Sequence, residues 1–268
     1  MKFLFKYPSR QRPKVFKECL GTWRKMLSNR HNYQFLISLD ADDVTMNTVE
    51  MKQYLDDQAG LVYYYGDNKS KVQAINADIN KVSEFDILVL MSDDMVPVVE
   101  GYDDIIAEHM TRYFNDLSGV LHYDDGRTGK ELNTLSIMGY NLYKKWGYIY
   151  HPDYTSLWCD NEFQEASEKV GKAIYINQVV IRHVWEKYLH DPLHHRNDKF
   201  YDVDHAVFLA RKAQGFPSGT VLPLPNPVAP PVSPRPQVLQ RPSPSFQPRA
   251  RTVIKMPTPI KVIRRPSR

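Results

Sequence analysis

Four short apolar runs, separated by three stretches with helical periodicity, occupy the N-terminal part of the chain. We predict strands at residues 3–7, 33–39, 61–65 and 85–91, and helices at residues 15–27, 44–55 and 71–82. This alternation is typical of right-handed βαβ units, which place successive strands parallel in one sheet. The sequence therefore predicts an α/β fold with a single, Rossmann-like, mostly parallel open sheet flanked by helices.

The composition of the chain changes near residue 217. Residues 217–268 contain 14 of the 19 prolines and 9 of the 35 lysines and arginines but no Asp or Glu, which leaves residues 1–216 with a net charge of −5. Because proline fixes φ and lacks an amide donor, we expect one domain at 1–216 and a disordered, Pro-rich basic tail at 217–268. The tail suits an arm that contacts DNA or another polyanion, and a solvated linker is the alternative.

Apolar length and cysteine content bear on the location of the protein. The apolar runs are far shorter than the roughly 20 residues that cross a bilayer, and the N-terminal run is shorter than the core of a signal peptide. Cys19 and Cys159 form neither a disulfide framework nor a spacing for metal ligands. We therefore expect no membrane span and a location in the cytoplasm, that of the host if the protein is viral.

All four predicted strands end in polar residues. These ends are Pro8-Ser9-Arg10, Asp40 to Asp43, Gly66-Asp67-Asn68 and Ser92-Asp93-Asp94. Ligands of open parallel sheets bind at the carboxyl ends of the strands, so carboxylates gather at the expected ligand-binding edge. Neither G-x-G-x-x-G nor G-x-x-x-x-G-K-[ST] is present, which argues against dinucleotide-dependent enzymes and P-loop NTPases.

Carboxylates crowded at one edge repel each other unless a cation joins them. Oxygen ligands suit Mg²⁺ or Mn²⁺, and a nitrogen ligand favours Mn²⁺. A metal ion at that edge can neutralise the charge that grows on a departing nucleoside diphosphate. The acidic strand ends therefore indicate a divalent-metal site, with helix capping as the alternative role of Asp93 and Asp94.

The segment from Phe85 to Met95 resembles the DxD segment of GT-A glycosyltransferases of the family 2 type, in which an acidic pair follows an apolar strand. The resemblance implies that Asp94 binds Mn²⁺ or Mg²⁺ on the diphosphate of a nucleotide sugar, with Asp93 nearer the ribose or the sugar. Ser92 stands in the first acidic position of a strict D-x-D.

Other segments resemble this family in the same order along the chain, over residues 2–210. The loop after the first strand resembles the one that wraps the nucleotide, the second strand end resembles the site of the base, and residues 68–76 resemble the loop and helix after the third strand. The resemblance implies a donor-binding role for Pro8, Ser9, Arg10, Asp40, Asp43, Asn68, Lys71 and Asp93. For Arg10 and Lys71, a solvated surface position is the alternative.

Two segments further along resemble the catalytic part of the family. Residues 158–163 resemble the acidic acceptor-side motif, which implies that Asp160 takes the proton of the acceptor hydroxyl. Glu162 is the alternative base, and capping a helix at 162–170 is the structural alternative for Asp160. His183 ends an apolar run at 174–181 that we predict as a strand, and it resembles the late His that completes the metal site. A hydrogen-bonded structural His is the alternative there.

Three further residues are candidates for the acceptor side. The flat ring of Trp158, next to the candidate base, suits stacking on a sugar or a nucleobase. Met138 and Gly139 follow an apolar run, and the glycine permits either close substrate approach or a turn.

The favoured function is metal-dependent transfer of a hexose or pentose from a nucleotide sugar, such as a UDP-sugar, to an acceptor hydroxyl with inversion. The basic tail makes hydroxymethylated DNA bases a candidate acceptor, since compact GT-A proteins of this kind resemble bacteriophage enzymes that decorate modified bases. Teichoic-type polymers, glycans and proteins are other candidates. The alternatives are a nucleotidyltransferase of similar sheet architecture and a nucleic-acid-binding module without enzymatic activity.

Overall fold

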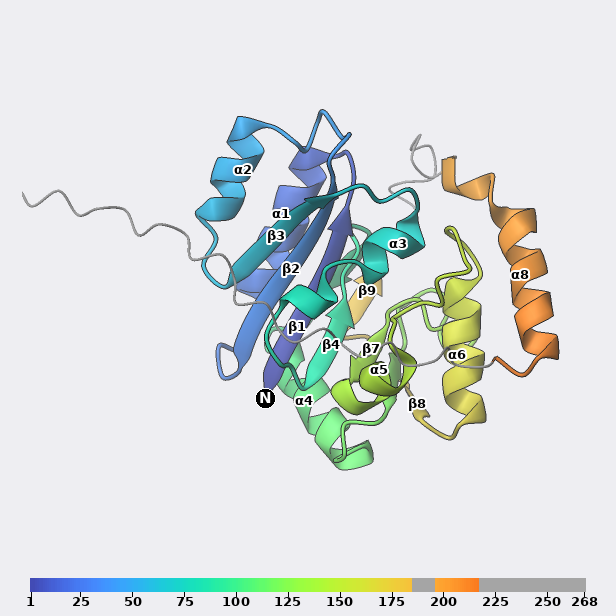
Figure 1. Ribbon diagram of the computed structural model, residues 1–268. Helices are drawn as coiled ribbons and strands as arrows, with labels where there is room; N and C mark the ends of the chain where they lie inside the picture. The colour runs from blue at the N-terminus through green and yellow to red at the C-terminus, as the bar shows by residue number, and fades with distance from the viewer. Residues whose placement is uncertain (185–195, 217–268) are drawn as a thin grey trace, which may run out of the picture. The chain divides into compact units, whose positions relative to one another are not determined.

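The computed structural model describes residues 1–184 and 196–216 of the chain (Figure 1). All of these residues belong to one compact unit. The predicted tail at 217–268 lies outside the described residues, so its disorder and the boundary at 216 stay predictions.

A seven-stranded sheet with the order β3-β2-β1-β4-β7-β6-β8 forms the centre of the fold (Figure 1). Its strands are β1 Lys2–Ser9, β2 Asn32–Asp40, β3 Leu61–Gly66, β4 Ile87–Leu90, β6 Val120–Tyr123, β7 Ile137–Gly139 and β8 Ala173–Ile176. The first four strands are mutually parallel, β7 runs antiparallel to β4 and β6, and β8 is parallel to β6. The predicted α/β class with a mostly parallel sheet is confirmed.

Helices cover both faces of the sheet. They are α1 Pro13–Lys25, α2 Val49–Asp56, α3 Lys71–Asn76, α4 Tyr102–Tyr113, α5 Tyr140–Trp146, α6 Cys159–Lys169 and α8 Tyr201–Ala213, with a 3₁₀ turn η1 at Ile79–Lys81. Side chains of α1, α2 and α4 belong to one apolar core, and side chains of α3, α5, α6 and α8 belong to the other. Helix α8 runs alongside α6 (Figure 1).

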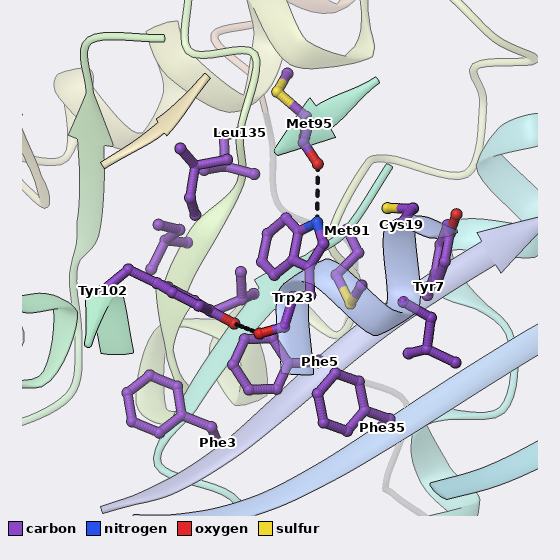
Figure 2. Close-up of a cluster of buried hydrophobic side chains, with 14 of the residues drawn as sticks. Phe3, Phe5, Tyr7, Cys19, Trp23, Phe35, Met91, Met95, Tyr102 and Leu135 are labelled. Carbon is purple, nitrogen blue, oxygen red and sulfur yellow. Dashed lines mark hydrogen bonds between the residues drawn. The ribbon is translucent and has the colours of Figure 1, made fainter. Parts of the chain in front are cut away.

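The alternation of side chains along β1 produces these two cores. Phe3, Phe5 and Tyr7 point to the core under α1 and α4, and Leu4 points to the other. In the first core, the indole Nε1 of Trp23 donates to the carbonyl of Met95 at 2.8 Å (Figure 2). The aromatic core thereby fixes the chain immediately after Asp94.

A second, two-stranded sheet lies beside this core. Strand β5 (Met95–Pro97) pairs antiparallel with β9 (Ile181–His183), and Met95 lies opposite His183. The apolar run predicted as one strand at 174–181 is in fact β8 and β9, which belong to different sheets. This split places His183 next to the segment that follows β4.

Three predicted helices have different bounds in the structure. The helix expected at 44–55 begins after Thr48, whose side chain accepts from the Met51 amide and caps α2. The helix expected at 71–82 ends at Asn76 because Ala77 is extended and Asp78 is left-handed, with φ 67°. The helix expected at 162–170 begins at Cys159, so Asp160 lies in its first turn and Trp158 is its N-cap.

Candidate active site

Asp94 lies at the end of the segment that links β4 to β5. The Ser92 hydroxyl donates to its Oδ1, and its Oδ2 is 3.4 Å from the Nε2 of His183. The amide of Val184 donates to the Asp94 carbonyl at 2.7 Å, which extends the β5–β9 pairing. The structure thus brings together the two residues that the sequence assigned to the metal.

Asp125 holds the other ring nitrogen of His183. Its Oδ2 is 3.3 Å from Nδ1, and the His183 amide donates to the Asp125 carbonyl at 2.9 Å. Asp125 is itself buried and accepts from the amides of Arg127 and Thr128 and from the hydroxyl of Thr134. The carboxylate therefore orients the ring with Nε2 toward Asp94. Asp125 was not predicted from the sequence, because Asp124-Asp125-Gly126 is typical of any surface turn.

His183 and the two carboxylates stabilise one another's charged forms. Burial alone would lower the pKa of His183, but its hydrogen bonds to Asp125 and Asp94 raise it to about 9. Burial alone would raise the pKa of Asp94, but His183 and the Ser92 hydroxyl lower it to about 2. The same imidazole and the surrounding donors hold the pKa of Asp125 well below its usual range. Two carboxylates therefore face a positive charge.

The donor set fits a divalent metal ion. A carboxylate oxygen of Asp94 and Nε2 of His183 lie side by side, and mixed oxygen and nitrogen ligands suit Mn²⁺ better than Mg²⁺. The Asp125 carboxylate on Nδ1 is the outer-shell partner that histidine ligands usually have. Metal binding at Nε2 would displace the proton that joins His183 to Asp94.

Asp93 faces a different partner. Its Oδ2 accepts from the guanidinium of Arg12 at 2.8 Å, and both side chains are mostly buried. Arg12 and Gln11 have left-handed backbones, with φ 55° and 60°, in the loop between β1 and α1. Arg12 was not predicted as a site residue, although Pro13 after it is a helix-start signal.

The loop of Arg10 crosses the end of β2. The Arg10 guanidinium donates to Asp40 at 2.7 Å and to Asp42 at 2.5 and 3.1 Å. Asp43 instead accepts from the amides of Gln11 and Thr45, so it fixes both loops. The Oδ1 of Asp40 is buried without a hydrogen-bond partner among the described residues. This leaves a free acceptor at the predicted site of the nucleobase.

The loop after β3 supplies the remaining donor-side candidates. Ser70 caps α3 by accepting from the Gln73 amide at 3.1 Å, and Lys71 is the first residue of that helix. Within residues 1–184 and 196–216, the Nδ2 of Asn68 is buried without a partner. The charge of Lys71 opposes the effect of burial on the pKa of two carboxyl groups, that of the metal candidate Asp94 and that of Asp160. Pro8 and Ser9 end β1 at the same edge.

Asp160 and Glu162 have different surroundings although both lie in the first turn of α6. Burial raises the pKa of Asp160 despite the charge of Lys71, which makes its carboxylate a stronger base. Glu162 is buried and accepts two hydrogen bonds from Arg211, at 2.7 and 2.8 Å, and one from Tyr154 at 2.7 Å. Both of its oxygens are therefore occupied in a structural ion pair.

The three acceptor-side candidates are all packed against protein. Trp158 stacks on His205 with ring centres 4.2 Å apart and also contacts Phe208. Met138 is fully buried in β7, and a Cβ at Gly139 would clash with the backbone of Leu117. The glycine is thus needed for packing, and Met138 and Gly139 have no surface for an acceptor.

A second group of metal-capable side chains comprises His31, Asp103 and Asp104, whose ligand atoms lie within 4.8 Å of one another. Asp103 already accepts from Ser28 and Tyr33, and Asp104 pairs with Arg30 and His31. His31 precedes β2, and the two carboxylates lie in the first turn of α4, where hydrogen bonds and ion pairs already occupy them. It serves as a structural network.

Comparisons with known proteins support the fold. No protein-family model and no curated protein sequence matches the chain. Among solved structures, the chain is similar to the mannosyltransferase PcManGT from Pyrobaculum calidifontis in complex with GDP-Man and Mn²⁺, with a TM-score of 0.57 and 12% identity over 83% of this chain and 66% of that one.

TarS of S. aureus, residues 1–349, is similar over 68% of this chain and 60% of its own. The TM-score is 0.52 at 15% identity, and the complex with UDP gives 0.53 at 16%. The chain thus spans about three fifths to two thirds of the length of these solved chains, and it shares the fold of these nucleotide-sugar glycosyltransferases.

No helix in the described part of the chain is long and apolar enough to cross a membrane.

Proposed function

We propose that the protein is a metal-dependent glycosyltransferase that moves a sugar from a nucleotide sugar to an acceptor hydroxyl. The observation that carries this proposal is the pairing of Asp94 with His183, whose ring is oriented by Asp125. The fold shared with proteins solved with GDP-Man and Mn²⁺ and with UDP supports it.

The donor would bind along the carboxyl ends of β1 to β4. Asp94 and His183 would hold Mn²⁺ or Mg²⁺, which would neutralise the charge of the diphosphate when bound. Asp93 and Arg12 lie next to this site, and the free oxygen of Asp40 suits an N–H of the base. Asn68 and Lys71 would complete the donor side, together with the loop of Pro8, Ser9 and Arg10. A UDP-sugar is our preferred donor.

Asp160 is our candidate for the catalytic base. The proton of the acceptor hydroxyl passes to its carboxylate while the hydroxyl oxygen bonds to the anomeric carbon. The bond from that carbon to the diphosphate oxygen breaks, and its electron pair stays on the phosphate. Attack opposite the leaving group gives inversion. Glu162 is excluded from this role in our proposal because Arg211 and Tyr154 occupy its oxygens.

Hydroxymethylated bases of DNA are our candidate acceptor. The nine positive charges of residues 217–268, a segment without Asp or Glu, would attract the phosphates of DNA. The rest of the chain carries a net charge of −5, so the tail is the part suited to this contact. Deletion of 217–268 should then weaken DNA binding and remove its salt dependence. Unchanged binding by the shortened chain would contradict this role of the tail.

The free, buried cysteines agree with a cytoplasmic location.

The proposal can be tested by calorimetric titration of UDP, UDP-glucose and GDP-mannose into the full chain, with and without Mn²⁺. We expect metal-dependent binding to the wild type that is lost in Asp94→Ala. Asp57→Ala is the matched control, because Asp57 is exposed at the end of α2. If folded wild-type protein binds none of the three nucleotides, the transferase proposal is refuted.

A further inference from the structure

A buried carboxylate on α8 binds the backbone that leads into α6. Asp204 is fully buried, and its oxygens accept from the amides of Thr155 at 2.9 Å, Ser156 at 2.7 Å and Leu157 at 2.7 Å. Burying a carboxylate costs free energy because it loses its contacts with water, and several hydrogen-bond donors must replace them. Three consecutive amides aimed at one carboxylate provide that compensation and fix the path of residues 155–157.

The same three residues connect the donor side to the candidate base. The carbonyl of Thr155 accepts from the amide of Val72 in α3 at 3.2 Å, next to Lys71. On the other side, Leu157 is followed by Trp158, the N-cap of α6, and by Asp160 in its first turn. The distance between the donor loop and Asp160 is therefore set through residues 155–157.

The backbone at Trp158 needs external support. Its φ of 62° is left-handed, a conformation that a bulky side chain rarely adopts unless its surroundings enforce it. The indole stacks on His205, the residue after Asp204, with the two ring planes 26° apart. Asp204 thus holds the amides of residues 155–157, and His205 holds the ring of Trp158 at the end of the same segment.

We propose that Asp204 is a positioning residue that sets the location of Asp160 relative to the donor. This inference rests on the proposed function, in which Asp160 is the base. Asp204 does not touch the reacting atoms. It acts through the amides of 155–157, so its loss should impair the chemical step and leave donor binding intact.

The test compares Asp204→Asn with Asp202→Asn in the full chain. Asp202 lies on the same helix but is exposed, which makes it a matched control. Amide hydrogen exchange reports the order of residues 155–162. Hydrolysis of UDP-glucose with Mn²⁺, in which water replaces the acceptor, gives kcat and KM, and calorimetry gives the Kd of UDP. The milder variant His205→Ala removes only the stacking partner of Trp158.

For Asp204→Asn we expect faster exchange at residues 155–162 and a kcat lowered about 100-fold, because a displacement of about 1 Å costs that much. The donor KM and the Kd of UDP should stay within about twofold, and Asp202→Asn should match the wild type. His205→Ala should lower kcat in the same sense, with an intact fold. If Asp204→Asn folds and keeps its kcat, or if donor binding falls in parallel with kcat, the inference is overturned.

The two proposals fail in different ways. If the wild type neither binds UDP nor hydrolyses UDP-glucose, the proposed function is wrong. The exchange comparison still decides whether Asp204 orders residues 155–162, since it needs no activity. Unchanged exchange in Asp204→Asn would then overturn the positioning role as well.

Discussion

The proposed donor and acceptor sides of the site are built in different ways. On the donor side, β1 to β4 are parallel and sequential, so each strand end delivers its polar residues to a common edge. On the acceptor side, with β6 to β8, α6 and α8, the important contacts join segments far apart in the sequence, such as Asp204 with 155–157. Local sequence patterns therefore reveal the first side better than the second.

The sharpest test of this comparison is Asp160→Asn. If Asp160 is the base, turnover of a UDP-sugar should fall by about 10²–10⁴-fold, because the carboxylate that takes the proton is gone. Binding of UDP with Mn²⁺ should persist, since the donor side is untouched. Steady-state kinetics and calorimetry on the same preparations measure both.

The control for this variant is Asp153→Asn, which alters a largely exposed carboxylate before α6. It should keep full turnover. An Asp160→Asn protein as active as the wild type would move the base to another residue.

Sequence patterns identified the residues whose position depends on one strand. Asp40 ends a strand and Asp94 follows one, so hydrophobic periodicity placed both at one edge, whereas Lys71 and the metal role of Asp94 came from the resemblance. His183 was assigned from resemblance, but its partner Asp125 lies in a turn that no periodicity links to β9. The pairing of β9 with β5, outside the main sheet, brings His183 to the segment of Asp94, and the His183 amide also bonds to the Asp125 carbonyl.

A sequence signal for the buried contacts of α8 does exist. Asp204, Phe208 and Arg211 lie at positions i, i+4 and i+7, so two charged residues share the buried face of the helix with an apolar one. Charges on an apolar stripe indicate buried partners, but the sequence does not say which. The partners, residues 155–157 and Glu162, are fixed only by how α8 packs on α6.

Glu162→Gln should mainly destabilise the fold. It removes the charge that compensates buried Arg211, and breaking such a pair costs about 3 kcal/mol or more. Urea denaturation measures the loss in the free energy of unfolding, and turnover per folded molecule should stay close to the wild type. The surface pair Glu165–Lys212 provides the control, since Glu165→Gln should cost under about 1 kcal/mol. A stable but inactive Glu162→Gln would make Glu162 the base instead.

Asp125→Asn should weaken metal binding without removing a ligand. The amide cannot hold the ring of His183 as the carboxylate does, and loss of such an outer-shell partner costs about 10–100-fold in metal affinity. Titration of Mn²⁺ in the presence of UDP measures this affinity. Asp124→Asn, one residue away and without a contact to His183, should bind Mn²⁺ like the wild type. Equal affinities for the two variants would remove Asp125 from the site.

The smallest expected effect concerns a buried lysine that periodicity did not reveal on the donor side. Lys6 is fully buried in β1, where it donates to Ser38, which in turn donates to Asp78 at 2.6 Å. Burial lowers the pKa of Lys6 to about 7, below its usual 10.5. In the window between these values the unfolded chain binds the proton and the folded chain does not, so this group adds stability as the pH rises.

Lys6→Met removes that dependence. The difference in unfolding free energy between variant and wild type should favour the variant by about 2 kcal/mol more at pH 7 than at pH 9, because only the wild type gains stability from Lys6 over this range. Urea denaturation at both pH values measures the difference, and groups common to the two proteins cancel. A difference independent of pH would mean that Lys6 keeps its proton in the fold. Confirmation would show that the donor side, too, depends on a contact between residues far apart in the sequence, Lys6 of β1 and Ser38 of β2, that its local pattern conceals.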